Sequence, residues 1–255
     1  MKKLVKYVMI DILRNKVVLG YTLFLLAVSF SVFNLEDNTS KGVLSLLNIV
    51  LIIVPLLSII FSTIYVYNSS EFIELLVSQP LKRTTLLTSI YAGLTTSLVL
   101  AVIVGIGLPV FLYNPTDVGF TLVISGVVLT AVFTGLALLA SVVTRDKAKG
   151  IGLSILLWFY FAIIFDGLIL FLLFQFADYP LEKVSIGLTA LNPIDLSRIL
   201  VLLKMDISAM MGYTGAVFKE FFEGWYGYLF ISAVMLMWLF FPVILSVRKF
   251  NKKDL

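Results

Sequence analysis

The chain has 255 residues, of which 60% are hydrophobic and 13% are charged, against roughly 45–50% and about 25% in soluble domains. So few polar residues cannot cover a soluble domain of this length, which excludes a soluble globular protein, a disordered chain and a coiled coil. The net charge is +4, and the chain contains neither cysteine nor histidine. Disulfides, cysteine or histidine catalysis, zinc sites and imidazole pH switches are therefore excluded.

Residues 2–16 form the first predicted element. Apolar side chains recur there at helical spacing, while most basic side chains lie elsewhere on the helix; the apolar set is Leu4, Val5, Val8, Met9, Ile12 and Leu13. This pattern predicts a basic amphipathic helix lying at the membrane interface. The alternative is an ordinary basic flank of the first membrane span.

Six segments approach the length of about 20 apolar residues that a helix needs to cross a hydrocarbon core about 30 Å thick. In chain order they are residues 17–33, 43–67, 84–113, 118–144, 151–177 and 225–247. The third is long enough to tilt or to kink at Pro109. Because lipid offers no partner to exposed backbone groups, we expect an all-α polytopic membrane protein with one transmembrane domain over residues 1–255.

The distribution of Lys and Arg predicts the orientation of the spans. Fourteen of these residues lie in the N-terminal segment, the loops after the second and fourth spans and the C-terminal tail, and five lie on the other side. Positive charge collects in cytoplasmic loops, so both termini are expected in the cytoplasm. The same rule explains the basic charge without any nucleic-acid partner.

Residues 68–80 predict a short helix between the second and third spans. Asn68 is expected to cap it and Glu71 to complete a capping box, while Pro80 ends it. Phe72, Leu75, Leu76 and Gln79 share one face, and Glu71 and Glu74 make its start acidic. Acidic residues fit poorly on an anionic inner leaflet, which favours a docking element for a soluble cytoplasmic partner. The alternative is a membrane-surface helix without a partner.

Residues 178–224 form a long external segment between the fifth and sixth spans. Asn192 as the N-cap and Pro193 at the first helical position predict the start of a helix, and Asp195 and Arg198 are spaced for a local ion pair. A second apolar run follows. We expect helices at or dipping into the outer leaflet, or a contact surface for an external partner.

Asp166 is the one acid inside a span, which makes it a functional candidate because a charge at that depth is costly. It is interpreted as a conformational latch, a proton or cation site, or a packing residue between helices. Methionine is the only soft sulfur ligand present. Met210 and Met211 are weak candidates for binding Cu(I), and packing is the alternative, so no metal site is assigned.

Together these parts resemble the membrane subunits of ABC-2-type transporters. The run Leu76–Leu81 resembles the end of the coupling helix in this family. Further runs are similar to permeases of ABC transporters that mature periplasmic nitrous oxide reductase: Lys147–Leu153, Trp158–Phe159, Phe165–Asp166, Leu191–Arg198 and Ser208–Met210.

The resemblance implies two copies of this chain, paired with two separate ATPase subunits in the bacterial inner membrane and with a periplasmic β-helix protein. The chain itself would be no enzyme and bind no cofactor, since ATP and Mg²⁺ belong to the ATPase. Coupling residues would be Glu71, Phe72, Glu74, Leu75, Leu76 and Gln79, and the residues facing the external partner would be Asn192, Pro193, Asp195 and Arg198. The implied role is to couple ATP hydrolysis to copper-site assembly during denitrification. Export of a peptide antibiotic, a lipid or an ion, and a scaffold that transports nothing, remain alternatives.

Overall fold

A computed structural model describes residues 2–36, 38–78, 82–176, 182–205 and 225–252, and within these ranges every regular element is a helix. The all-α prediction is therefore confirmed. The short helices are α1 (Lys2–Leu13), α4 (Ser70–Val77), α10 (Glu182–Thr189) and α11 (Pro193–Lys204). The long helices are α2 (Lys16–Leu35), α3 (Thr39–Asn68), α7 (Asp117–Val143) and α13 (Trp225–Asn251).

Two further helices are composite, because each contains one π-helical turn. The first consists of α5 (Arg83–Val102), η1 (Ile103–Gly107) and α6 (Leu108–Tyr113), and the second of α8 (Lys147–Phe159), η2 (Tyr160–Ile164) and α9 (Phe165–Gln175). Counting each composite once, the described residues contain 6 helices long and apolar enough to cross a membrane. Their bounds lie within a few residues of the predicted spans, and α13 continues about one turn beyond the expected end.

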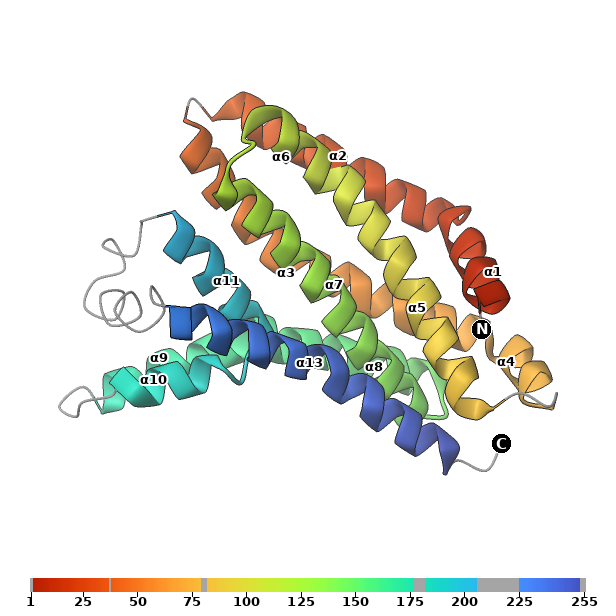
Figure 1. Cartoon of the computed structure of the whole chain (residues 1–255). Coiled ribbons are helices and arrows are strands. Elements are labelled where there is room, and N and C mark those ends of the chain that lie inside the picture. Colours follow the sequence, from red (N-terminus) through yellow and green to blue (C-terminus); the bar gives the residue numbers. More distant parts are fainter. Residues whose placement is uncertain (1, 37, 79–81, 177–181, 206–224, 253–255) are drawn as a thin grey trace.

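The long helices run side by side, and the short helices gather at the two ends of the bundle (Figure 1). One end carries α1, α4 and both ends of the chain. The other carries α10, α11 and the turn between α2 and α3. The loops that hold the excess of Lys and Arg, and are therefore predicted to be cytoplasmic, lie at the end that carries α1 and α4.

Helix α7 forms the centre of the bundle. In its most apolar stretch 72% of the residues are buried, against 11% for the α8–α9 span. Phe133 of α7 is fully buried and meets Phe161 edge-on, and Phe161 in turn meets Trp238 of α13. Gly135 lets α13 approach closely, because an added Cβ would lie 3.2 Å from Pro242. The α8–α9 span is left with most of its side chains facing outward.

Polar side chains fix where several helices begin. Asn15 accepts a hydrogen bond from the Val17 amide at the start of α2, and Asp146 accepts one from the Lys149 amide at the start of α8. Such caps satisfy amides that have no partner inside the helix. The cap at Asn15 separates α1 from the first span, so the interfacial helix expected over residues 2–16 ends at Leu13.

The third span widens ahead of Pro109. Proline cannot donate the helical hydrogen bond, and its ring would clash with the carbonyl one turn earlier. The π-helical turn η1, in which the Leu108 amide bonds to the Ile103 carbonyl, shifts the backbone at this position. The same turn contains Gly105, where an added Cβ would lie 2.6 Å from Leu25 Cβ on α2.

The capping box predicted at Asn68 is wrong. Helix α3 continues through Asn68, so Ser69 is the only residue between α3 and α4, and it makes no side-chain cap. The side-chain oxygen of Asn68, Oδ1, instead accepts a hydrogen bond of 2.7 Å from Lys147 Nζ. The amide of Ser69 bonds to the Tyr65 carbonyl, which extends the α3 hydrogen-bond pattern to the start of α4. Tertiary contact and helix continuation override the local signal at this position.

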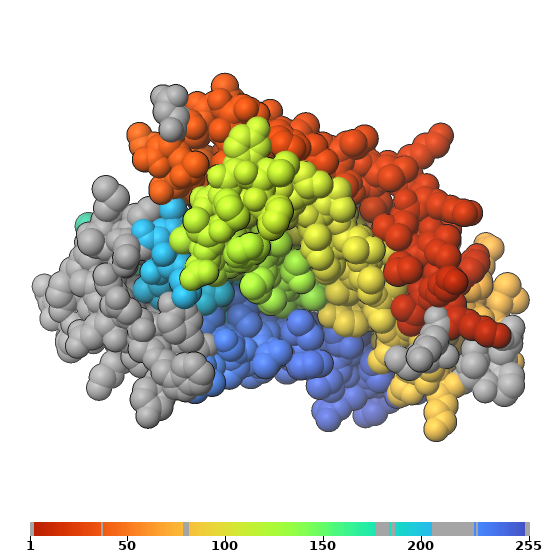
Figure 2. Space-filling view, turned by 45° about the horizontal axis from the view of Figure 1, so that its top comes forward, coloured from red at the N-terminus to blue at the C-terminus, as the bar shows by residue number. Residues whose placement is uncertain are grey.

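Helix α1 lies on the surface of the bundle along α5 (Figure 2). Val8 and Ile12 are buried on its inner side, and Ser97 of α5 donates to the Met9 carbonyl. Gly93 permits this approach, because an added Cβ would lie 2.5 Å from Val8 Cγ1. The amphipathic pattern of α1 therefore serves packing within the chain.

Gly93→Ala should destabilise the protein, because the new methyl group forces the stiff side chain of Val8 away. Gly152→Ala is the matched control, since nothing lies within 4 Å of the added Cβ on α8. Both variants gain about 1 kcal/mol of helix propensity, but overpacking at Gly93 costs about 1–3 kcal/mol. Thermal unfolding in one detergent should rank Gly93→Ala below wild type and Gly152→Ala at or above it. Equal melting of the two variants would contradict the packing argument.

Candidate functional site

Helix α4 presents an acidic and apolar outer face at the end of the bundle. Ile73 is buried on its inner side, where α4 packs against α3 and α5. Glu71, Glu74 and Leu75 are exposed, and Leu75 keeps 66% of its surface accessible. Phe72 and Leu76 are half-buried, while Gln79 lies outside the described residues. The predicted apolar face is thus divided, with Leu75 turned outward and Phe72 and Leu76 partly covered.

Helix α1 lies next to α4. The rings of Tyr7 and Phe72 have centroids 5.5 Å apart, and Tyr7 remains 57% exposed. The two helices therefore form one surface, which we call the α1–α4 face: Tyr7, Glu71, Phe72, Glu74 and Leu75. A neighbouring cavity of about 310 Å³ separates part of α4 from α7 and α13, and Glu74 and Arg145 both line it.

The end of α3 is fastened to the α7–α8 turn. The Tyr67 hydroxyl donates to the Thr144 carbonyl oxygen at 3.1 Å and also bonds the Thr144 hydroxyl. Gly150 leaves room for this ring, since an added Cβ would overlap it. Deeper in the bundle, the hydroxyls of Thr63 and Ser154 bond at 2.7 Å, and Trp158 Nε1 donates to the Ile52 carbonyl. Helices α3 and α8 are therefore held together by polar contacts along their length.

A second polar cluster joins α9 to α11 at the opposite end of the bundle. Arg198 donates to Asp166 at 2.9 Å and to Asp195 at 3.1 Å. The side chains of Arg198 and Asp166 are about one-third exposed, and that of Asp195 is almost buried. The predicted pair between Asp195 and Arg198 is confirmed, and the pair with Asp166 extends it to the fifth span. We call Asp166, Asn192, Asp195 and Arg198 the α9–α11 latch.

Asn192 is the fully buried centre of the α9–α11 latch. Its Oδ1 accepts from the Ile194 amide, which confirms the predicted cap, and Pro193 follows at the first helical position. Its Nδ2 donates to Asp195 and, at 2.9 Å, to the Phe161 carbonyl in η2. A π-helical turn displaces carbonyls from the regular helical pattern, and Asn192 supplies a donor to one of them. Helix α11 is thereby bonded to the fifth span at two points.

The residues expected to face an external partner are mostly inside the chain. Asn192, Pro193 and Asp195 are buried, and the partner contact expected of them stays a prediction. Arg198 alone of this set keeps substantial exposure. Trp238 of α13 donates to the Ala190 carbonyl, which also ties the start of α11 to the bundle.

No group of three or more His, Cys, Asp or Glu side chains that could hold a metal occurs among the described residues. Met210 and Met211 lie outside them. The α9–α11 latch holds two carboxylates around one guanidinium, an arrangement suited to a mechanical or proton-dependent contact.

Sequence reasoning missed the Asp166–Arg198 contact. One signal was available in the placement of the arginines. Apart from Arg198, the other four arginines of the chain lie in the segments that carry the predicted cytoplasmic charge. An acid within a span needs a partner, and Arg198 was the remaining arginine. The pair between Thr63 and Ser154 left no comparable signal, since hydroxyl residues occur throughout the spans.

Residues 9–255 match the family described as ABC-2 family transporter protein. This chain belongs to the ABC-2 transporter family. It is similar to the probable ABC transporter permease protein NosY of Pseudomonas aeruginosa, with 27% identity over 224 residues that cover 79% of this chain and 81% of the relative. As an ABC-2 permease, the chain is a membrane subunit, and the family implies that its ATPase is a separate subunit.

The latch of this ABC-2 permease should make its stability depend on pH. Burial, together with the neighbouring Asp166 carboxylate, raises the pKa of Asp195 from 3.8 to about 7, against the opposing effects of Arg198 and Asn192. A carboxyl whose folded pKa is raised stabilises the fold below its unfolded pKa, and this contribution is lost as the pH rises toward the folded pKa.

We therefore expect a lower melting temperature at about pH 8 than at about pH 5.5, and a smaller difference in Asp195→Asn, which mimics the protonated form. Asp117→Asn, at the exposed start of α7, serves as the control and should keep the wild-type difference. A pH dependence that Asp195→Asn leaves unchanged would refute the assignment to Asp195. Thermal unfolding in detergent measures the melting temperature of wild type and of each variant at the two pH values.

Proposed function

We propose that this permease, as a pair of copies bound to two ABC ATPase subunits, transmits ATP-driven motion across the bacterial inner membrane to support copper-site assembly in nitrous oxide reductase. The similarity to NosY supports the reductase, and the family supports the ATPase. The observation that carries the coupling role is the α1–α4 face, an exposed acidic and apolar surface on a helix continuous with a membrane span.

The orientation follows from charge. The end that carries α1, α4, the α7–α8 turn and the C-terminus holds the basic loops, so we place it in the cytoplasm. The α9–α11 latch then faces the periplasm. The α1–α4 face is at the correct end for a soluble ATPase, and Leu75 flanked by Glu71 and Glu74 has the chemistry of a helix that enters an apolar groove with a basic rim.

Motion can pass through the protein by contacts between helices. Displacement of α4 acts on α3 directly, because one residue joins them. The hydrogen bonds from Thr63 to Ser154 and from Trp158 to the Ile52 carbonyl link α3 to α8. The fifth span then carries the displacement to Asp166, and Arg198 passes it to α11. A rigid-body shift of packed helices is the type of two-state change that such coupling requires.

Charge reversal tests the docking assignment. Glu71→Lys and Asp117→Lys are matched, because each removes an acid from the first turn of a helix but at opposite ends of the protein. We expect Glu71→Lys to lower the ATPase recovered with the purified permease by about tenfold, by losing electrostatic complementarity. Asp117→Lys should recover wild-type amounts. Equal recovery by both variants would reject the docking assignment.

The same variants test the reductase role in a strain that lacks this permease and grows by denitrification. Nitrous oxide should accumulate in the headspace of the deletion strain, disappear with plasmids that encode wild type or Asp117→Lys, and persist with Glu71→Lys. If the deletion strain consumed nitrous oxide normally, the reductase role would be rejected. Pairing with the ATPase would still be tested by the amount of ATPase recovered with the permease. Export of a peptide, lipid or ion would then be the function to examine.

A further inference from the structure

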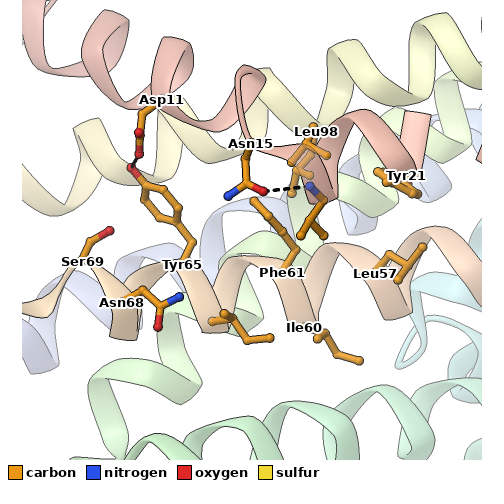
Figure 3. A pocket seen from close by; sticks show the side chains of 13 residues that line it. Asp11, Asn15, Tyr21, Leu57, Ile60, Phe61, Tyr65, Asn68, Ser69 and Leu98 are labelled. Atoms are coloured by element: carbon orange, nitrogen blue, oxygen red, sulfur yellow. Dashed lines mark hydrogen bonds between the residues drawn. The ribbon is translucent and has the colours of Figure 1, made fainter. Parts of the chain in front are cut away.

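A cavity of about 390 Å³ lies between the α1–α2 junction and the second half of α3, apart from both the outer surface of α4 and the α9–α11 latch (Figure 3). Its volume is in the range of small-molecule pockets. The proposed coupling function makes no use of it.

The cavity is polar at one end. Asp11, Asn15, Asn68 and Ser69 line this end, and the Tyr65 hydroxyl donates to Asp11 Oδ2 at 3.0 Å. Within the described residues Asp11 makes no ion pair. The Oδ1 atoms of Asn15 and Asn68 accept hydrogen bonds from Val17 and Lys147, which leaves their Nδ2 groups as donors toward a ligand. This end therefore offers one carboxylate and two amide donors, and the Lys147 ammonium lies beside Asn68.

The other end of the cavity is apolar. It is lined by side chains of α2, α3 and α5, among them Val18, Leu57, Phe61 and Leu98. Tyr21 also lines it and is only 7% exposed, with its hydroxyl buried beside Ser58 of α3.

The polar end lies where the short helices α1 and α4 meet membrane spans. Asn15 caps the first span directly after α1, and Asn68 with Ser69 joins α3 to α4. Both junctions are therefore expected at headgroup depth, with the apolar end of the cavity extending toward the hydrocarbon core. The polarity gradient of the cavity runs in the same direction as that of a lipid leaflet.

We propose that this cavity binds one phospholipid with a primary ammonium headgroup, of the phosphatidylethanolamine type. The ammonium group pairs with the Asp11 carboxylate, and the phosphate accepts from the amide groups of Asn15 and Asn68. One acyl chain follows Leu57 and Phe61 along α3. An anionic headgroup could approach Lys147 but would leave Asp11 without a cation, whereas a zwitterionic headgroup complements both charges. Bound there, the lipid bridges the α1–α2 junction to α3.

Native mass spectrometry of the intact permease tests the proposal after delipidation and addition of phosphatidylethanolamine or phosphatidylglycerol. Wild type should retain phosphatidylethanolamine about tenfold better, because a charge-assisted hydrogen bond distinguishes the headgroups. Asp11→Asn, which keeps the shape of the side chain, should remove this preference, and Asp117→Asn should keep it. Leu57→Trp, which fills the apolar end, should lower retention of both lipids at unchanged melting temperature.

Equal retention of the two lipids by wild type, or an unchanged preference in Asp11→Asn, would overturn the assignment. If soluble phosphoethanolamine competed fully with the lipid, the site would bind the headgroup alone. That result would overturn the assignment of an acyl chain to the apolar end. A second copy of the chain is the competing occupant. Val17→Cys, in an otherwise cysteine-free chain, would then form a disulfide between copies, and this outcome would also overturn lipid binding.

Discussion

The contact between Asp166 and Arg198 is the constraint on which the end of this permease that carries α10 and α11 depends. An acid on a span needs a partner, and here the partner comes from a helix outside the spans. Satisfying that charge draws α11 against the bundle and places Asn192 where it can reach the Phe161 carbonyl in η2. Helix α11 is thereby joined to a particular turn of the fifth span, so a movement of that span would act on α11.

The rest of the bundle divides into a rigid centre and exposed edges. Helix α7 is enclosed by neighbours that approach closely at glycines such as Gly135, while the α8–α9 span keeps most of its surface outward. Close packing resists small deformations, so displacement is more easily carried by whole helices than by bending within α7. The fifth span, which has little of its surface packed and makes polar contacts with α3 and α11, is the element best placed to move.

Strong and local sequence signals predicted much of this arrangement. Hydropathy located the six spans because the bilayer permits few solutions, and Asn192 with Pro193 marked a helix start because capping depends on neighbouring residues alone. The cap at Asn68 failed because α3 continues through it and because Lys147, at the start of α8, donates to its side-chain oxygen. The partner of Asp166 is 32 residues away in sequence, and its choice depended on how α11 folds back. The π-helical turns depend on tertiary packing as well as on Pro109.

The central claim is that α11 and the fifth span move as one unit because Arg198 holds Asp166. Electron paramagnetic resonance can measure it in the complex with the ATPase, using labels at Phe174→Cys and Leu191→Cys, two exposed positions on either side of the latch in a chain without cysteines. Mixing labelled with unlabelled copies reports the distance within one permease. The account predicts the same narrow distance distribution with ADP and with ATP, and a broadened one in Arg198→Met. A distance that changes between nucleotides in wild type, or a distribution unaffected by Arg198→Met, would contradict it.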